Sequence, residues 1–563
     1  MIRTQPLTSK AMNKIKFLTA AALLGACGVS SAQVAPPDAG KVLTGNTAAA
    51  PKAPADTKAP QVKVPVEAVA EKDDGAKVLV SSVSITGNTV IGSQELVDLV
   101  QDQLGKPQSL AGMKALARRI GDYYRSKGYP FARALIPAQD FKGGALGITI
   151  LEGRYGSVSP TGTQEMVDGA KPFLVYHLRS GDVIEAQLLE HTLLVLDDVP
   201  GIEVVPTVSP GLKSGTGDLS VQTVLAEPSG GEFGVDNHGS RYTGEYRAHL
   251  NWFRNSGLTF GDRLALSVMV TDENMWLGSA DYELPLDGNG LRASVGYAHT
   301  TYELGKDFAS LGASGLAKIW SAKLSRPLIR SQMFNLQAAV GIQHKTLQDD
   351  FATTATSERK FSHNFPVSLR FDKRDGLLGG AISYGQLTCT YGDLHLDDAL
   401  FAADASTAQK SGSFVKVNFD LARIQKLPGS FSAYFRASFQ WSNSNLDSSE
   451  RLTLGGAEGV RAYPMGEGSG DEGWLGQVEL RYDASSFSPF VFLDAGSTSL
   501  NHTPWDLASD KTRTISGAGV GVRTAYGRWN GEVVVATRLD GGVPQADSRT
   551  AATRILFSAS RSF

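Results

Sequence analysis

The sequence predicts a transmembrane β-barrel of about 16 antiparallel strands, preceded by two small α/β domains. After the N-terminus no apolar run approaches ~18 residues, which excludes transmembrane helices but not membrane strands, because such strands are apolar only at alternate positions. All seven Trp lie beyond Pro228, and Trp favours membrane interfaces. Residues 431–441 alternate without a break between apolar and polar side chains and carry an aromatic residue at each end. These observations predict strands that cross a membrane.

Composition excludes several classes of function. The chain has 54 basic and 57 acidic residues among 563, so its charge does not indicate a nucleic-acid partner. Its two cysteines are Cys27 and Cys389. Cys27 lies in a segment that we expect to be removed, which leaves no internal disulfide. No Ser/His/Asp arrangement, metal-spaced cluster or phosphate-binding loop is recognisable. We therefore expect no catalytic residues, no metal and no cofactor.

Residues 1–32 are predicted to be a secretory signal peptide. Lys14 and Lys16 precede an apolar core at residues 17–26, and small residues end at Ala32, as in cleaved export signals. An alternative is that residues 24–27 (LGAC) form a lipoprotein box, which would place a lipid on Cys27. Residues 33–76 are rich in Ala, Pro and Lys. Repeated prolines favour an extended linker over a helix, so we expect a tether there.

Residues 77–153 and 154–227 are each predicted to form a small α/β domain. In the first domain, the periodicities predict strands at 78–85, 132–136 and 146–151, with helices that begin at Ser93 and Ser109. In the second domain, they predict a helix at 184–196 and strands at 202–208 and 219–225. An open sheet edge beside a helix could accept an unfolded chain as an added strand. The alternative is that these domains are only spacers.

Residues 228–563 are predicted to form the barrel. Their number supports about 16 strands, with 14 or 18 as alternatives. If the short turn at Pro428-Gly429 is periplasmic, the strand that follows rises outward and the long loop up to Glu472 is extracellular. A second periplasmic turn is predicted at residues 529–531 (WNG), since Asn-Gly favours tight hairpins. The C-terminus then lies in the periplasm and ends on Phe563.

The long loop contains residues 455–463 (GGAEGVRAY), and its arginine is the central candidate of the chain. On a later strand Val491, Leu493 and Ala495 form a lipid-facing set, so Phe492 and Asp494 would face the lumen. An ionised aspartate there would attract a cation, and arginine can offer two parallel hydrogen bonds. If the loop folds inward, Arg461 would meet Asp494, with Glu479 as a second partner. The alternative is a solvated arginine on an external loop.

Several of these motifs resemble the two-partner secretion transporters, the hemolysin activator and filamentous hemagglutinin secretion family. Residues 193–201 (LLVLDDVPG) and 215–219 (GTGDL) are similar to the family's second POTRA domain, a periplasmic polypeptide-transport module, and residues 236–244 (DNHGSRYTG) to the opening of its barrel. The sixth-loop motif of the family is matched by Gly455, Gly456, Val460, Arg461 and Tyr463, and its barrel-wall partner by Phe492, Asp494 and Gly496. Phe563 looks like the terminal signal by which outer-membrane barrels are assembled.

The chain also departs from the family pattern at two places. Ala462 stands where the family usually has Gly, which removes some backbone freedom. In addition, the proline-rich N-terminal segment does not show the helix with which family members often plug the pore.

The resemblance implies an outer-membrane transporter of a Gram-negative bacterium. Its POTRA domains would bind one large unfolded exoprotein, hemolysin- or adhesin-like, and the barrel would pass it to the surface, with activation of the exoprotein as a further expectation. Outer-membrane lipid and the barrel assembly machinery are implied as further partners, and nucleic acid is not. The alternatives are an insertase of the same superfamily, whose members usually carry more periplasmic modules, and a diffusion porin, which would not explain residues 78–227.

Overall fold

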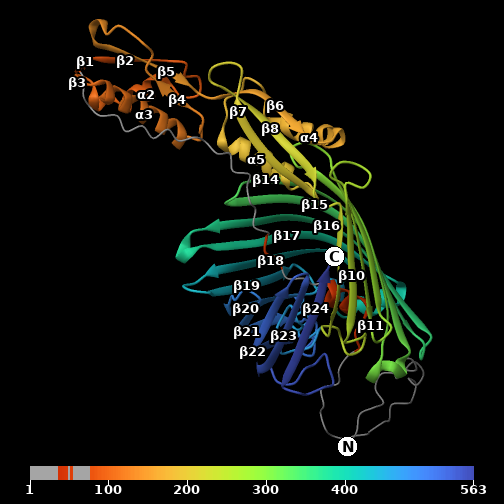
Figure 1. The fold of residues 1–563 in the computed structure, drawn as a ribbon. Helices are drawn as coiled ribbons and strands as arrows, with labels where there is room; N and C mark the ends of the chain where they lie inside the picture. Colours follow the sequence, from red (N-terminus) through yellow and green to blue (C-terminus); the bar gives the residue numbers. More distant parts are fainter. Residues whose placement is uncertain (1–35, 48–50, 55–75) are drawn as a thin grey trace, which may run out of the picture.

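The structure, a computed structural model, describes residues 36–47, 51–54 and 76–563. The predicted signal peptide and the alternative lipoprotein box lie outside these residues. Two α/β domains project from one end of a large closed barrel, and the C-terminus lies in the barrel wall (Figure 1). Within the described part of the chain, no helix is long and apolar enough to cross a membrane.

The barrel consists of the sixteen strands β9 to β24, each antiparallel to its neighbours, and β24 closes the ring on β9. This confirms the predicted fold class. The strands are β9 Ser229–Asp236, β10 Arg247–Asn255, β11 Arg263–Thr271, β12 Trp276–Pro285, β13 Arg292–Glu303, β14 Ala313–Arg330, β15 Phe334–Phe351, β16 Thr356–Asp375, β17 Ala381–Leu396, β18 Gly412–Lys426, β19 Phe431–Ser442, β20 Glu472–Tyr482, β21 Phe487–Ser499, β22 Thr512–Tyr526, β23 Trp529–Asp540 and β24 Thr553–Ser562.

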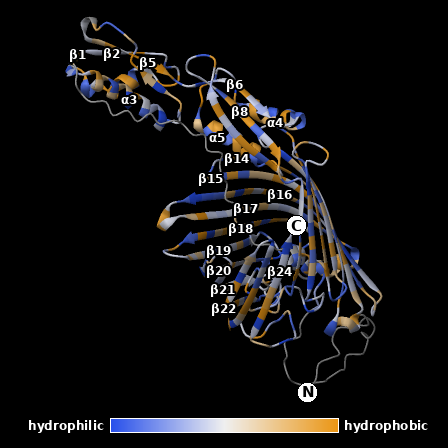
Figure 2. Cartoon of the chain, in the orientation of Figure 1, coloured by the Kyte–Doolittle hydropathy of each residue, from blue (hydrophilic) through white to orange (hydrophobic). Residues whose placement is uncertain are grey.

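Alternating side chains give the barrel wall two different faces, and hydrophobic and hydrophilic residues accordingly alternate along its strands (Figure 2). On β21 the side chains of Val491 and Leu493 are 52% and 57% exposed, whereas Phe492 and Asp494 between them are buried. The exposed set faces the lipid and the buried set faces the lumen, as the alternation predicts.

The predicted turn at residues 529–531 is wrong. The chain reverses at Gly527 and Arg528, and Trp529 already opens β23, where it pairs with Tyr526. Gly527 has a φ of +59°, a left-handed conformation that glycine adopts without steric cost. The glycine that sets this turn therefore lies before the tryptophan, and the Asn-Gly pair continues the strand.

The first α/β domain packs one long helix on a three-stranded sheet of order β2-β5-β4, with β1 and β3 forming a separate pair. Helix α3 is capped by Ser109, whose side chain accepts a hydrogen bond from the amide of Gly112. Its side chains Ile120 and Tyr124 are fully buried. The short β3 contains a proline and was not predicted. The elements are β1 Val78–Val80, β2 Ser82–Thr86, α2 Ser93–Asp98, β3 Lys106–Gln108, α3 Leu110–Ser126, β4 Arg133–Leu135 and β5 Ala145–Leu151.

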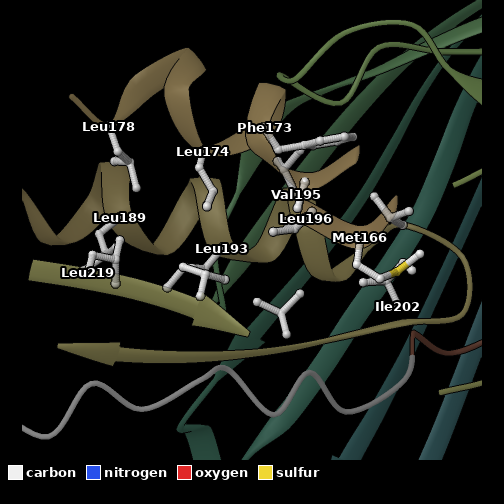
Figure 3. Close-up of a cluster of buried hydrophobic side chains, with 14 of the residues drawn as sticks. Met166, Phe173, Leu174, Leu178, Leu189, Leu193, Val195, Leu196, Ile202 and Leu219 are labelled. Carbon is white, nitrogen blue, oxygen red and sulfur yellow. The ribbon is translucent and has the colours of Figure 1, made fainter. Parts of the chain in front are cut away.

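The second α/β domain covers a sheet of order β6-β8-β7 with two helices. Figure 3 shows its core, in which leucines of the helices α4 and α5 pack against Ile202 and Leu219 of the sheet. Helix α4 was not predicted. It contains Pro172, and proline normally breaks a helix. Burial of Phe173 and Leu174 offsets this cost. The elements are β6 Arg154–Thr161, α4 Gln164–His177, α5 Ala186–Asp197, β7 Ile202–Pro210 and β8 Thr216–Leu225.

The second α/β domain packs directly against the turns at the end of the barrel from which it projects. Asp198 receives two hydrogen bonds from the guanidinium of Arg330, at 2.6 and 2.7 Å. Both His177 and His191 contact the side-chain oxygen of Asn289, at 2.8 and 3.2 Å. These turns lie at the end of the barrel that the topology expected from the sequence assigns to the periplasm, and each odd-numbered strand from β9 to β23 runs away from it.

The expectation of a tether without a helix at residues 33–76 is wrong in one segment. Helix α1, Ala39–Thr47, lies inside the barrel (Figure 1, red) and packs on the inner wall. It occupies a proline-free window between Pro37 and Pro51. Asp38 begins it by accepting a hydrogen bond from the amide of Lys41 at 2.9 Å. The average composition of the segment hides this window.

Candidate functional site in the barrel lumen

Loop 6, residues 443–471 between β19 and β20, folds into the barrel instead of standing outside it. The guanidinium of Arg461 donates to both carboxylate oxygens of Asp494, at 2.8 and 2.7 Å, and to Glu479 at 2.6 Å. The backbone amide of Arg461 also donates to Asp494. None of the three side chains is more than 5% exposed. The structure thus brings together the loop arginine and both wall carboxylates named from the sequence.

Aromatic and charged neighbours complete the surroundings of Arg461. Its guanidinium lies 3.6 Å from the ring centroid of Phe492, a favourable cation–π contact. Glu479 accepts further hydrogen bonds from Arg481 at 2.8 Å and from Arg523 at 2.9 Å. Glu479 therefore keeps two cationic partners of its own, whereas Asp494 has Arg461 as its one ion-pair partner among the described residues.

The glycines of the motif allow the tight path of loop 6. A Cβ added at Gly455 would lie 2.2 Å from the carbonyl oxygen of Pro464, and Gly456 has a φ of +111°. No larger residue fits the first position without movement of the backbone, and the second favours glycine. Val460 and Tyr463 are fully buried, and the Tyr463 hydroxyl lies within 3.0 Å of the carbonyl oxygen of Gly542.

Two small residues on the wall receive the loop. A Cβ added at Gly496 would lie 2.7 Å from the side chain of Leu454, so this wall glycine makes room for the loop. Ala462, the departure from the family motif, packs against Gly517, where an added Cβ would lie 2.6 Å from the Ala462 methyl. The extra methyl is therefore accommodated by a glycine on the facing strand.

A second anchor of loop 6 was not foreseen from the sequence. Glu450 is 2% exposed and accepts hydrogen bonds from Lys345 at 2.6 Å and from Asn364 at 2.8 Å, while Lys416 lies 2.7 Å from its other oxygen. Burial alone would raise the pKa of Glu450, but the ammonium groups of the two lysines outweigh it and lower this pKa to about 2. Lysines at lumen-facing strand positions were the sequence signal that could have indicated this anchor.

A third anchor holds the other limb of the loop. Glu467 is fully buried and accepts hydrogen bonds from Arg513 at 2.6 and 2.8 Å. It also accepts from the backbone amides of Gln545 at 2.7 Å and Ala546 at 2.8 Å. Loop 6 is thus tied by buried ion pairs at both limbs and at its tip.

The pKa of Glu450 predicts how this anchor responds to acid. Because the folded pKa, about 2, lies below the usual value of 4.5, its contribution is complete above pH 4.5 and is lost as the pH falls towards 2. The shift corresponds to about 3 kcal/mol. We expect Glu450→Gln to lower the thermal unfolding temperature at neutral pH, by a margin that shrinks below about pH 4.5. Glu458→Gln, an exposed site on the same loop, is the matched control and should show neither effect.

Helix α1 lies between loop 6 and the opposite wall. Its apolar side chains Val42 and Leu43 are buried in a cluster with Tyr242 and Met275. On the loop side, a Cβ added at Gly40 would lie 2.2 Å from the Ser448 hydroxyl, so the backbones approach closely. Further contacts with the loop and the wall are made by Gly45, which faces Met465, and by Asp38, which accepts from Ser448 at 2.7 Å and from Lys360 at 3.4 Å.

Phe563 lies where the barrel closes. Its backbone exchanges two hydrogen bonds with Gly231 of β9, at 3.0 and 3.2 Å. A Cβ added at Gly231 would lie 2.5 Å from the phenyl ring of Phe563. The side chain of Phe563 therefore covers β9, the strand on which the barrel closes. No group of three or more His, Cys, Asp or Glu side chains among the described residues could hold a metal ion.

Comparison with known proteins identifies the family. The profile described as "Haemolysin secretion/activation protein ShlB/FhaC/HecB" matches residues 215–524. The profile described as "POTRA domain, ShlB-type" matches residues 78–153. The chain belongs to this haemolysin secretion/activation family. It is an outer-membrane transporter of the two-partner secretion class, with its POTRA domains in the periplasm, and the insertase alternative is disfavoured.

Individual relatives agree with this assignment. The heme/hemopexin transporter protein HuxB of Haemophilus influenzae is 27% identical over 82% of this chain and 83% of its own length. The outer membrane transporter CdiB of Escherichia coli is 25% identical over 84% of this chain and 81% of its own length. A solved structure of CdiB from Escherichia coli has a TM-score of 0.69 at 20% identity, covering 88% of this chain and 93% of that one, and shows the same fold. Members of the family are transporters that secrete exoproteins.

Proposed function

We propose that this transporter opens by releasing α1 from the lumen while loop 6 stays anchored, and that an unfolded exoprotein then passes in extended form along the vacated path. The observation that carries the proposal is the unequal attachment of the two lumen occupants. Loop 6 is fixed by the buried ion pairs of Arg461, Glu450 and Glu467. Helix α1 has 9 residues, too few for independent stability. Besides its short apolar face, it is held by single hydrogen bonds to Asp349, Ser448 and Arg247 and by an ion pair at 3.4 Å between Lys360 and the half-exposed Asp38.

The wall around α1 is suited to a wet path for a polypeptide. Positions that line the lumen beside α1 include Arg247, Asn418 and Asp420, which carry charged or amide groups. An extended chain needs water or polar partners for its backbone N–H and C=O groups. Arg461, held on the opposite side by Asp494, would keep loop 6 against the wall and out of this path. A disulfide that locks α1 in the lumen tests the proposal, because it should block export.

The edge strand β7 is the proposed first contact of the exoprotein. In the order β6-β8-β7, β7 has one strand partner among the described residues, so its other edge carries free backbone donors and acceptors. Val205 on this strand is 46% exposed. Strand addition at such an edge binds an extended chain through main-chain hydrogen bonds and leaves most of its sequence unspecified.

Site-specific crosslinking tests this contact. We expect a photoreactive residue at Val205 to crosslink strongly to the secretion domain of the exoprotein. The matched control is Val224 of the inner strand β8, 44% exposed and close to Val205 in the cross-strand register. It should crosslink at least about fivefold less, since an inner strand offers no free edge. Equal crosslinking at both positions would indicate binding to the sheet face and contradict strand addition.

Two further roles are part of the proposal. Phe563, at the closing strand, is the proposed recognition point for the barrel assembly machinery, supported by its exposed aromatic ring, 51% accessible. The exoprotein is proposed to be hemolysin- or adhesin-like and to be activated by secretion, as the description of the family suggests.

A further inference from the structure

Four of the nine histidines of the chain lie close together on the outer surface of the barrel. They belong to neighbouring strands: His299 on β13, His344 on β15, His363 on β16 and His395 on β17. Two adjacent cross-strand rows contain them. The row nearer the extracellular end is His299, Lys318, Thr346, Phe361 and His395, and the row below it is Tyr297, Trp320, His344, His363 and Asp393. We call His299, Lys318, His344, His363 and His395 the histidine patch.

Strand alternation and exposure show that this patch faces outward. Trp320 in the lower row is 61% exposed and Phe361 in the upper row is 38% exposed. The rings stack laterally: His344 and His363 have centroids 4.8 Å apart, and His395 lies on Phe361 at 4.6 Å with nearly parallel planes. The histidine side chains therefore form a continuous surface and do not point into the lumen.

The histidine patch lies at the extracellular boundary of the apolar, lipid-facing band of the barrel wall. On β15 the outward positions from Phe334 to Ile342 are all apolar, a stretch of about nine residues, which is the length that a tilted membrane strand needs. His344 is the next outward position towards the extracellular end. Tyr297 and Trp320 stand in its row, with ring centroids 4.3 Å apart, as aromatic residues do at the headgroup level. The patch is therefore at the height of the outer-leaflet headgroups.

The charged groups on this face favour an anionic headgroup once its histidines are protonated. Lys318 supplies an ammonium group, and the exposed Arg359 stands on the next row towards the exterior. Asp393 is the acid inside the two rows, 3.7 Å from His395. Asp350 and Glu303 lie further out on β15 and β13, and Asp397 stands beside Arg359, whose backbone amide donates to its carboxylate at 2.6 Å. Imidazole is the side chain that becomes cationic in mildly acidic surroundings. With the four imidazoles protonated, the six cations of this face exceed its four acids.

We propose that the histidine patch binds the phosphate-bearing headgroup of an outer-leaflet lipid, and that this binding strengthens as the surroundings become mildly acidic. The acyl chains of the lipid would lie on the apolar band below, where Ile342 and Val295 are 55% and 57% exposed. The headgroup phosphate would lie against Lys318 and the protonated imidazoles, which donate charge-assisted hydrogen bonds. This inference concerns the outer wall and does not depend on the proposed transport path.

Binding of phosphatidylglycerol to the full chain in neutral detergent micelles tests the proposal. Its phosphodiester stays singly charged between about pH 5.5 and about pH 8, so any pH dependence belongs to the protein. We expect the affinity of the wild type for a fluorescent phosphatidylglycerol to be about tenfold higher at the lower pH, and its affinity for phosphatidylcholine to change less than about twofold.

Variants locate the effect. The fourfold variant His299→Gln, His344→Gln, His363→Gln and His395→Gln should lose the pH dependence. Lys318→Gln should weaken phosphatidylglycerol binding at both pH values and keep the pH dependence. The matched control, His249→Gln with His502→Gln, changes a lumen and a loop histidine and should behave as the wild type.

If the fourfold variant does not fold, the four single variants replace it, and each should lose part of the pH dependence. Full pH dependence in the histidine variants, or equal wild-type binding of the two lipids at the lower pH, would overturn the proposal.

Discussion

Replacement of Arg461 by alanine is expected to abolish export and to destabilise the barrel by about 3–5 kcal/mol, because it leaves a buried carboxylate without its cation. The side chain of Asp494 is fully buried and its ion pair is made by Arg461. Asp494→Ala should cost less, since Arg461 then retains Glu479 at 2.6 Å. Export of the exoprotein and thermal unfolding in detergent measure the two effects.

A double-mutant cycle separates pairing from the loss of either side chain alone. The variant carrying both Arg461→Ala and Asp494→Ala should be more stable than the sum of the single effects predicts, by about 1–3 kcal/mol, because no unpaired charge remains buried. Arg119→Ala, an exposed arginine paired with Asp102 on the first POTRA domain, is the control and should cost at most about 1 kcal/mol. Additive single effects would contradict direct coupling.

A disulfide between α1 and loop 6 is expected to reduce export at least about tenfold. Gly45→Cys and Met465→Cys place two thiols where the chains already touch, since an added Cβ at Gly45 would have the Met465 side chain as its nearest neighbour, 3.0 Å from Cγ, and that side chain is the one replaced. The variant is built with Cys389→Ser, which removes the free thiol on β17. Oxidation would hold α1 in the lumen, and a reductant should restore export.

The control disulfide must leave α1 free. Thr388→Cys and Asn418→Cys, which face each other across β17 and β18, crosslink two wall strands that are already paired. Oxidised, this variant should export like the wild type. If the locked α1 variant exported normally under oxidising conditions, then α1 need not leave, and the proposed opening would be wrong.

Local periodicity predicted the parts of the site that lie on strands. Because alternation on β21 assigns Asp494 to the lumen side, a single charged candidate, Arg461, could be matched to it from the amino-acid sequence alone. The other anchors, Glu450 and Glu467, lie in an irregular loop without periodicity. Their partners Lys345 and Arg513 are on strands far away in sequence, and only the closed ring brings them to the loop.

The helices that were missed show a different limitation of sequence reasoning. Helix α1 follows a proline and α4 contains one, and proline raises the free energy of a helix when it lies inside it. In α1 the helix begins just after Pro37 and is stabilised by burial of Val42 and Leu43 against the barrel wall. In α4 the neighbours of Pro172 are buried in the domain core. In both cases tertiary packing stabilises the helix, and no local sequence pattern indicates that packing.

The attachment of the second POTRA domain to the barrel turns changes the kinetics of capture. The paired Asp198 and Arg330, and the histidines around Asn289, hold β7 at a fixed distance from the pore. An exoprotein segment bound there meets the lumen at an effective concentration in the millimolar range, as for modules joined by a short connection. Weak binding at β7 is then sufficient to start transport, and the exoprotein can leave the edge strand rapidly as export proceeds.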